Sequence, residues 1–417
     1  MNLIIKAVLW IIYLISLYFA VFWFIVLIDN EQKPRRKKHK EKPFVSIVIP
    51  AYNEEKRIKA TVMSILGLDY PRDKIELIVV NDGSKDNTVK VVKKIISENH
   101  HFDIRLISQS NKGKGAALNN GMRNCKGEFF VCFDADSFVE ENALNIMLPY
   151  FAEDNVAAVL PIIKVAKPKN LLQRMQWFEY NVNMFYKYLL GRLDCIHVLP
   201  GPFSVYKKSI LKKVGGFDEN HNLTEDLEMA LRLQKNSYKI IQLKSPTVTT
   251  IAPDNFKALY KQRNRWYKGS VLNVVKYRGM LLNKKYGDFG LFQLPIVLIS
   301  GLMTLVMMLA IIYYTLKPYV KGLYNMSFVG FDFMTFIRNY TFHFDILEIN
   351  YLMLFVSLVI FILSIYILSK SHSFFEERYM KFGMLSVILY VTSYFFILGV
   401  VWIGIAADLI RGKKQKW

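Results

Sequence analysis

The stretch Glu128-Phe-Phe-Val-Cys-Phe-Asp-Ala-Asp136 joins a short apolar run to two carboxylates, and similar apolar runs occur upstream of it. Helical patterns separate these runs, and this alternation predicts an α/β fold with a mostly parallel sheet and helices covering its faces. The expected strands are 44–50, 75–80, 104–108 and 128–133, and the expected helices are about 54–66, 86–98 and 116–125. Ligands of such sheets bind at the carboxyl ends of the strands, so the polar residues that follow the strands are expected to converge.

Four stretches of the 417-residue chain carry no charged residue, namely 7–28, 289–316, 349–369 and 382–407. Each reaches the ~20 residues that a helix needs to cross a bilayer. The first is too long for the apolar part of a signal peptide, and no small-x-small cleavage site follows it, so we expect a retained anchor. The expected regions are a membrane helix (1–30), a basic linker (31–43), a catalytic domain (44–253), an interfacial amphipathic helix (254–284) and a C-terminal membrane region (285–417).

The net charge of +21 is concentrated beside the apolar stretches, at 33–42 after the first and at 411–416 after the last. Such clusters orient membrane helices and contact anionic lipids, and no nucleic-acid-binding motif accompanies them, so we expect no nucleic acid partner. The first cluster predicts a multi-pass protein of the cell membrane with a cytoplasmic catalytic domain. Four spans would leave the basic C-terminus outside. Either 382–407 is re-entrant or broken near Gly399, or 327–346 adds a membrane-embedded piece.

Two groups of carboxylates suit chemistry on a nucleotide. Asp134 and Asp136 follow an apolar strand, where they can hold a divalent cation against a diphosphate, although Asp-x-Asp is also common in surface loops. Asp82 follows another strand and can accept a hydrogen bond from a base or ribose, or simply belong to a turn. The segment Pro50-Ala-Tyr-Asn-Glu54 has the same two interpretations.

The other candidate functional residues lie at the starts of two predicted helices and on one basic helix. The segment 111–118 leads glycines and lysines into a helix N-terminus, which attracts anions, or else forms a solvated basic loop. Glu225 and Asp226 follow a predicted N-cap, Thr224; acids there suit the helix dipole, and one of them could act as a general base. Gln262, Arg265 and Trp266 share one helix face, suited to a pyrophosphate and a sugar ring or to membrane anchoring.

Taken in order, these motifs resemble those of the processive family 2 glycosyltransferases, which include cellulose, chitin, hyaluronan and poly-N-acetylglucosamine synthases. The resemblance covers 44–269 and implies a GT-A fold attached to an α-helical transmembrane region. It also implies a UDP-sugar donor, Mg²⁺ or Mn²⁺, and inversion at the anomeric carbon. The segments 111–119, 214–218, 224–226 and 261–266 look most like poly-N-acetylglucosamine synthases.

The resemblance also implies residue roles. Nucleotide-sugar binding is expected of Pro50, Tyr52, Glu54, Asp82, Lys114, Asp134, Gln262, Arg265 and Trp266. Metal binding is expected of Asp134 and Asp136, catalysis of Asp226 as general base with Glu225, and acceptor binding of Gly201, Pro202, Phe203 and Trp266. The acceptor loop departs from the family pattern, because Pro200-Gly-Pro stands where serine-glycine is usual.

The expected reaction is polymerisation of a UDP-sugar, best matched by UDP-N-acetylglucosamine, into a β-linked polysaccharide that the spans export. Expected partners are the donor, a growing glycan or lipid acceptor, membrane lipids and a small membrane subunit. One alternative is a glycosyltransferase that adds sugar to a ceramide or polyprenyl-type lipid, and another is a membrane-surface binding protein with a degenerate site. Cys125, Cys132 and Cys195 lack metal or redox spacing and are expected to be buried thiols.

Overall fold

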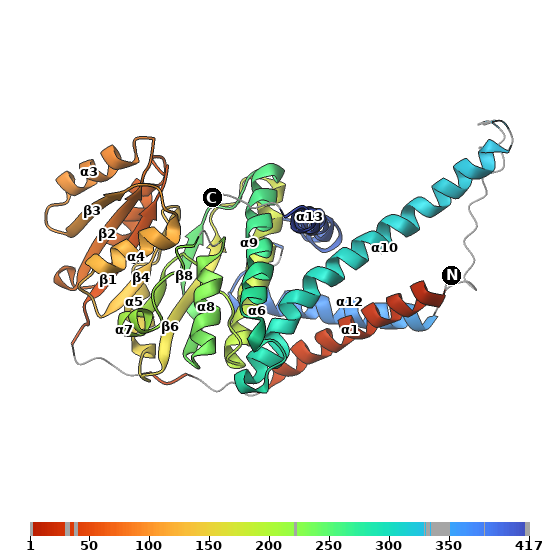
Figure 1. The fold of residues 1–417 in the computed structure, drawn as a ribbon, viewed down its shortest axis with the longest axis horizontal. Coiled ribbons are helices and arrows are strands. Elements are labelled where there is room, and N and C mark those ends of the chain that lie inside the picture. The colour runs from red at the N-terminus through yellow and green to blue at the C-terminus, as the bar shows by residue number, and fades with distance from the viewer. Residues whose placement is uncertain are drawn as a thin grey trace.

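A mixed sheet of eight strands forms the centre of the region between the first and second long apolar helices in the computed structural model (Figure 1). The structure describes residues 3–29, 34–36, 41–220, 223–328, 330, 334, 351–378 and 380–412. The strands are β1 (Val45–Ala51), β2 (Ile75–Asp82), β3 (Asp103–Gln109), β4 (Phe129–Cys132), β5 (Ser137–Val139), β6 (Val156–Val165), β7 (Ser204–Lys207) and β8 (Lys239–Thr250). Their order is β3-β2-β1-β4-β7-β6-β8-β5.

Most neighbouring strands run in the same direction. The pairs β1–β2, β2–β3, β1–β4 and β6–β8 are parallel, whereas β4–β7, β6–β7 and β5–β8 are antiparallel. The four strands expected from the sequence are therefore β1 to β4, and their parallel register is confirmed. The antiparallel part of the sheet was not expected, because the alternation of apolar runs and helical patterns becomes less regular after Glu140.

The helices of the sheet domain are α2 (Ile58–Leu66), α3 (Thr88–Glu98), α4 (Lys114–Asn124), α5 (Ala143–Met147), α6 (Leu171–Arg192), α7 (Lys208–Lys213), α8 (Glu225–Lys235) and α9 (Phe256–Lys276). Short helical turns are η1 (Arg72–Lys74), η2 (Leu148–Tyr150), η3 (Arg278–Met280), η4 (Lys284–Tyr286) and the π-helical η5 (Phe289–Gln293). The first expected helix starts later than predicted because residues 54–57 form a turn, in which the Glu54 amide donates to Thr88 Oγ1.

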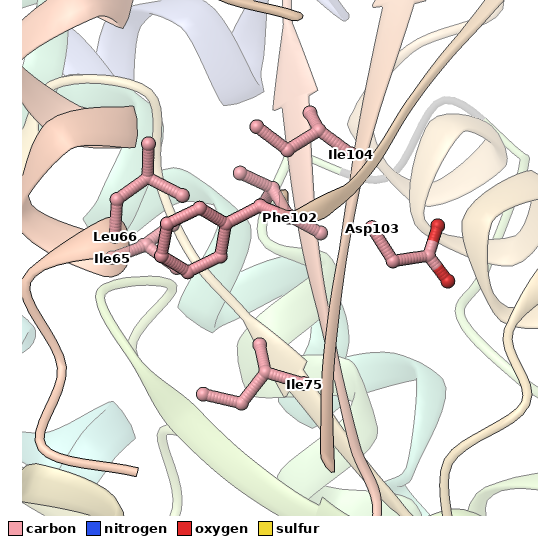
Figure 2. Close-up of a pocket in the computed structure, with 7 residues that line it drawn as sticks. Ile65, Leu66, Ile75, Phe102, Asp103 and Ile104 are labelled. Atoms are coloured by element: carbon pink, nitrogen blue, oxygen red, sulfur yellow. The ribbon is translucent and has the colours of Figure 1, made fainter. Parts of the chain in front are cut away.

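Helices cover both faces of the parallel strands, so β2 is buried along its whole length. Two separate apolar clusters result, one with α2 and α3 on one face and one with α4 and α8 on the other. Figure 2 shows a small gap where α2 meets β2 and β3, lined by Ile65, Leu66, Ile75, Leu77, Phe102, Asp103 and Ile104. Its volume of about 10 Å³ is at the lower limit for one water molecule, so it is a packing detail and not a ligand site.

Four helices among the described residues are long and apolar enough to cross a membrane, and they make this chain a membrane protein. They are α1 (Leu3–Ile28), α10 (Leu294–Ser327), α12 (Tyr351–Phe374) and α13 (Met384–Ile410). In Figure 1, α1, α10 and α12 extend away from the sheet, whereas α13 is viewed nearly along its axis. Helix α13 therefore runs across the direction of the other three and packs against α6, α9 and α10.

Helix α13 continues without a break through Gly399, so of the alternatives left open for 382–407 the broken helix is wrong. The glycine instead permits close packing, because a Cβ at this position would overlap Met308 of α10. The alternative membrane-embedded piece at 327–346 lies mostly outside the described residues. Helix α10 also extends further than the apolar stretch predicted, through Pro318 to Ser327.

Helix α9 differs in character from the amphipathic helix expected at 254–284. It ends at Lys276, and its buried side chains are mostly polar, including Arg263, Asn264, Lys268 and Asn273. Arg263, Lys268 and Asn273 are tolerated on this face because they bind Glu179 of α6, Asp408 of α13 and Thr224 at the start of α8, respectively. The helix is thus enclosed by other elements, with an exposed edge at residues such as Leu272 and Val275.

Candidate active site

The carboxyl ends of β1, β2 and β4 lie side by side and bring the first set of candidate residues together. Ala51 is in register with Asn81 of β2, and Val48 is in register with Cys132 of β4. The residues that follow these strands therefore share one edge of the sheet. The candidate residues there are Pro50 near the end of β1, Tyr52 and Glu54 after it, Asp82 at the end of β2, and Asp134 and Asp136 after β4.

Lys114, the first residue of α4, links two candidate groups that are far apart in the sequence. Its Nζ lies 2.8 Å from Asp134 Oδ1 and 3.0 Å from Glu225 Oε1. Burial alone would lower the pKa of Lys114, but Asp134 and Glu225 outweigh it and hold this pKa well above its usual value. The lysine is therefore a permanent cation between the strand-end carboxylates and the start of α8.

The strand-end carboxylates have the chemistry of a shared divalent-cation site. Burial and then the neighbouring Asp134 raise the pKa of Asp136, and burial and then Asp136 raise the pKa of Glu54. Repelling carboxylates of this kind are stabilised by a cation. Among the described residues no three His, Cys, Asp or Glu side chains are grouped closely enough to hold a metal alone. Asp134 and Asp136 instead fit a Mg²⁺ or Mn²⁺ ion that takes further ligands from a diphosphate.

Asp82 is almost fully buried, and both of its carboxylate oxygens accept hydrogen bonds from protein. Oδ1 accepts from Gln109 Nε2 at 2.8 Å and from the Lys112 amide at 2.9 Å, while Oδ2 accepts from the Gly113 amide at 2.8 Å. The carboxylate thus fixes the loop that enters α4 and places Lys114. The Lys112 and Gly113 amides, which lie in the segment expected to attract an anion, donate to Asp82 instead. Contact between Asp82 and a nucleobase stays a prediction.

Glu225 and Asp226 open helix α8, as expected. Burial and then Glu225 raise the pKa of Asp226 to about 6, although Lys114 and Arg265 act in the opposite direction. A carboxylate with this pKa is ionised at neutral pH yet basic enough to accept a proton. Glu225 is buried, and its Oε2 has no hydrogen-bond partner among the described residues.

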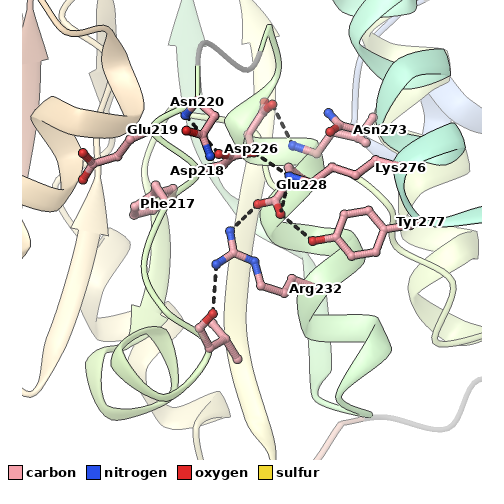
Figure 3. A network of polar contacts seen from close by, with 12 residues as sticks. Phe217, Asp218, Glu219, Asn220, Asp226, Glu228, Arg232, Asn273, Lys276 and Tyr277 are labelled. Carbon is pink, nitrogen blue, oxygen red and sulfur yellow. Dashed lines mark hydrogen bonds and ion pairs between the residues drawn. The ribbon is translucent and has the colours of Figure 1, made fainter.

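Thr224 is the N-cap residue by position, but its side chain does not cap the helix. Its Oγ1 instead accepts a hydrogen bond of 2.9 Å from Asn273 Nδ2 of α9. Further along α8, Glu228 contacts Arg232, Tyr277 and Lys276 (Figure 3). These contacts brace the helix that carries Asp226 against α9.

Gln262, Arg265 and Trp266 lie on one face of α9, and all three are partly buried. Arg265 Nη1 donates to the Leu223 carbonyl at 3.2 Å, and its charge lowers the pKa of Asp226. The predicted common face is therefore confirmed, and it adjoins the start of α8.

The loop at 200–203 is divided between the site and the core. A Cβ added at Gly201 would overlap the Asp134 carboxylate and lie 2.6 Å from Lys114 Nζ, so this backbone passes directly against the site. Phe203 has a positive φ of 56°, and its fully buried ring meets Phe133 edge-on at 5.3 Å. The Phe203 ring therefore belongs to the core beneath the loop, and the predicted contact of Phe203 with an acceptor stays a prediction that only its backbone could meet in this conformation.

Helix α6 contributes polar residues that the sequence did not single out. Glu179 binds Arg263 of α9, and both are buried. Burial lowers the pKa of Lys187 to about 8, although nearby Asp226 opposes the shift. The signal available in the sequence was the presence of Glu179 and Lys187 within a helix rich in aromatic residues. The three cysteines are free and buried, as expected.

Comparison with known proteins agrees with this geometry. Residues 46–215 match the family model described as Glycosyl transferase family 2. A poly-beta-1,6-N-acetyl-D-glucosamine synthase of Staphylococcus epidermidis is 27% identical over 310 residues, which cover 73% of this chain and 74% of that protein. Its counterpart in S. epidermidis strain RP62A is 25% identical over 384 residues, or 91% and 87% of the two chains.

One further relative by sequence and one solved structure are also similar to this chain. The probable glycosyltransferase YdaM of Bacillus subtilis is 31% identical over 274 residues, 62% of this chain and 63% of that one. A mannosyltransferase from Pyrobaculum calidifontis, solved with GDP-Man and Mn²⁺, superposes over 98% of this chain and 97% of its own, with a TM-score of 0.62 and 17% identity. Residues 46–215 form a glycosyl transferase family 2 domain, and the fold of the chain is GT-A. Within that class the chain is similar to the poly-β-1,6-N-acetylglucosamine synthases.

Proposed function

We propose that this protein polymerises UDP-N-acetylglucosamine into a β-linked polysaccharide and passes the product between its membrane helices. The observation that carries the proposal is the contact of Lys114 with both Asp134 and Glu225, which joins a donor site to a catalytic carboxylate pair. The donor and product are supported by the names of relatives that match up to 91% of the chain.

The donor diphosphate would lie at the ends of β1 and β4, where the strand-end carboxylates and the α9 face enclose it. Asp134 and Asp136 would hold a Mg²⁺ or Mn²⁺ ion, which neutralises charge on the leaving diphosphate. Arg265 and Gln262 would bind the same diphosphate from α9, since a guanidinium suits phosphate oxygens. Pro50, Tyr52, Glu54 and Asp82 would border the nucleoside.

Asp226 would act as the general base. It takes the proton from an acceptor hydroxyl, and the oxygen attacks the anomeric carbon from the face opposite UDP. The bond from that carbon to the diphosphate oxygen breaks, UDP leaves with the electron pair, and the configuration inverts. Lys114 keeps Glu225 in place beside Asp226. General-base catalysis of the kind proposed for Asp226 typically contributes ~10²–10⁴-fold in rate.

The acceptor would approach between Trp266 and the backbone of Gly201 and Pro202. Trp266 offers an apolar plane for the terminal sugar. Gly201 has no side chain, so the backbone of this loop lies directly against the Asp134 and Lys114 pair. Repeated addition is proposed because α9 lies at the base of the membrane helices, against α10 and α13.

We further propose that only α1, α10 and α12 cross the membrane and that α13 lies across them. Helices that cross one bilayer are usually tilted by only about 20° from its normal, whereas Figure 1 looks along α13 and across the others. Three spans return the chain to the side of the catalytic domain. Both basic clusters, 33–42 and 411–416, then lie on the cytoplasmic side that such clusters favour.

The test is a donor panel with the full-length protein in lipid nanodiscs containing Mn²⁺. UDP-N-acetylglucosamine, UDP-glucose, UDP-galactose and UDP-glucuronate are supplied separately, and UDP release and product size are measured. The proposal expects fastest release from UDP-N-acetylglucosamine and a high-molecular-weight product. Release that depends on added lipid and yields only lipid-sized product would establish the lipid glycosyltransferase instead.

A further inference from the structure

A buried ion pair lies directly behind the α9 face that carries Gln262 and Trp266. Arg263 is completely buried and binds both carboxylate oxygens of Glu179 on α6, with Nε 3.2 Å from Oε1 and Nη2 bonded to Oε2. A buried ion pair stabilises a protein little more than apolar packing of the same volume would, because both charges lose their hydration. What the charged pair adds is a single fixed orientation of the Arg263 and Glu179 side chains.

Arg263 is in contact with two of the residues that the proposed mechanism uses. Its Nη1 donates to Gln262 Oε1, and its guanidinium carbon lies 4.3 Å from the centre of the Trp266 ring. The same guanidinium lies 5.8 Å from the Tyr180 ring of α6. A planar cation in this place fixes both the amide of Gln262 and the plane of Trp266, because its donors and its face point in set directions.

The pair is also attached to α13. The Tyr394 hydroxyl donates to Glu179 Oε2 at 2.7 Å, so the carboxylate is held from α9 and α13 at once. Met175 of α6, Leu259 of α9 and Tyr394 form a buried apolar cluster beside it. Three elements therefore meet at one carboxylate: α6 provides it, and α9 and α13 bind it.

We propose that Glu179, acting through Arg263, is the positioning residue for Trp266 and Gln262, and that Tyr394 makes helix α13 part of the support of the acceptor site. The inference rests on the proposed function, in which Trp266 stacks on the acceptor sugar. A loosened Trp266 leaves the donor bound but the acceptor hydroxyl misplaced, and water then reaches the anomeric carbon more often. The sensitive quantity is the ratio of UDP released to sugar incorporated.

The test compares Tyr394→Phe with Tyr390→Phe in the full-length protein. The first removes one hydroxyl from Glu179 and keeps the ring. The second removes a hydroxyl one turn away on α13 that makes no hydrogen bond to any described residue, while its ring still stacks on Phe178. In nanodiscs with Mn²⁺ and saturating UDP-N-acetylglucosamine, Tyr394→Phe should raise the ratio about three- to tenfold, since misplaced reactants lose rate steeply. Tyr390→Phe should leave the ratio unchanged.

A second variant, Arg263→Lys, keeps the charge but loses the planar fork, and it should raise the ratio at least as much as Tyr394→Phe. A purely structural role for the cluster would lower UDP release and incorporation in parallel and leave the ratio at the wild-type value, which would overturn the inference. A wild-type protein that releases no UDP from any of the four donors would overturn the proposed function itself, and the inference with it.

Discussion

Acidification should inhibit this enzyme because its proposed general base titrates near neutrality. Burial and Glu225 raise the pKa of Asp226 to about 6. With that value the ionised fraction falls from about 90% at pH 7 to about 10% at pH 5, so kcat at saturating donor should fall about tenfold. The measurement is UDP release against pH from 4.5 to 8, with Mn²⁺ held constant.

Two variants should move the midpoint of this profile in opposite directions. Glu225 raises the pKa of Asp226 and Lys114 lowers it, so Glu225→Gln should shift the midpoint down and Lys114→Met should shift it up. Both variants will also lower the maximal rate, because they remove contacts within the site, but the direction of the shift does not depend on that loss. Shifts of the same sign, or a wild-type rate that stays constant between pH 5 and 7, would refute the assignment.

Stability should change with the opposite sign to activity, which separates titration from unfolding. A carboxyl group with a raised pKa in the folded state binds its proton more readily there than in the unfolded chain. Folding is therefore favoured as the pH falls from about 6 toward 4, the usual range of an aspartate. Asp136 and Glu54 have raised pKa values and contribute with the same sign. Burial lowers the pKa of His197 to about 4 and acts in the opposite direction, so the check is a comparison of wild type with Asp226→Asn: the melting temperature of the wild type relative to this variant should rise as the pH falls from 7 to 5.

Three further outcomes follow from single positions. Gly201→Ala should lower kcat/KM by about 10²-fold without lowering the melting temperature, because its Cβ would displace the Asp134 carboxylate, and steady-state kinetics with melting curves test this. Asp136→Asn should raise the Mn²⁺ concentration for half-maximal UDP release at least about tenfold, and an unchanged requirement would remove Asp136 from the metal site. Gly301→Val should destabilise the membrane helices by about 1–3 kcal/mol, seen by denaturation in detergent, since its Cβ would enter the Trp402 ring.

The sheet edge could be predicted from sequence because local patterns determine it. Apolar runs of strand length, separated by helical periods, specify parallel strands, and parallel strands place Asp82 and Asp134 at one edge. Helices α2, α3 and α4 could be predicted in the same way, from the helical patterns between the apolar runs. The common face of Gln262, Arg265 and Trp266 followed from helical spacing alone.

Other features depend on contacts between distant segments and left little trace in the sequence. The bridge from Lys114 to Glu225 requires α4 and α8 to meet, and no local pattern encodes that meeting. Resemblance placed Phe203 at the acceptor, but a positive φ turns its ring into the core. Hydropathy measures how readily α13 enters a membrane and says nothing of its direction, so the sequence left the number of spans open, and the proposal of three spans rests on the direction of α13.

The most direct test of the central claim is the length of the product made by wild-type protein and by Asp226→Asn from radiolabelled UDP-N-acetylglucosamine in excess. The account predicts long chains from the wild type, even at low total conversion. It predicts a loss of about 10²–10⁴-fold in incorporation by Asp226→Asn, with UDP binding retained. A wild-type product limited to one sugar on a lipid would contradict polymerisation, and undiminished incorporation by Asp226→Asn would contradict the catalytic site.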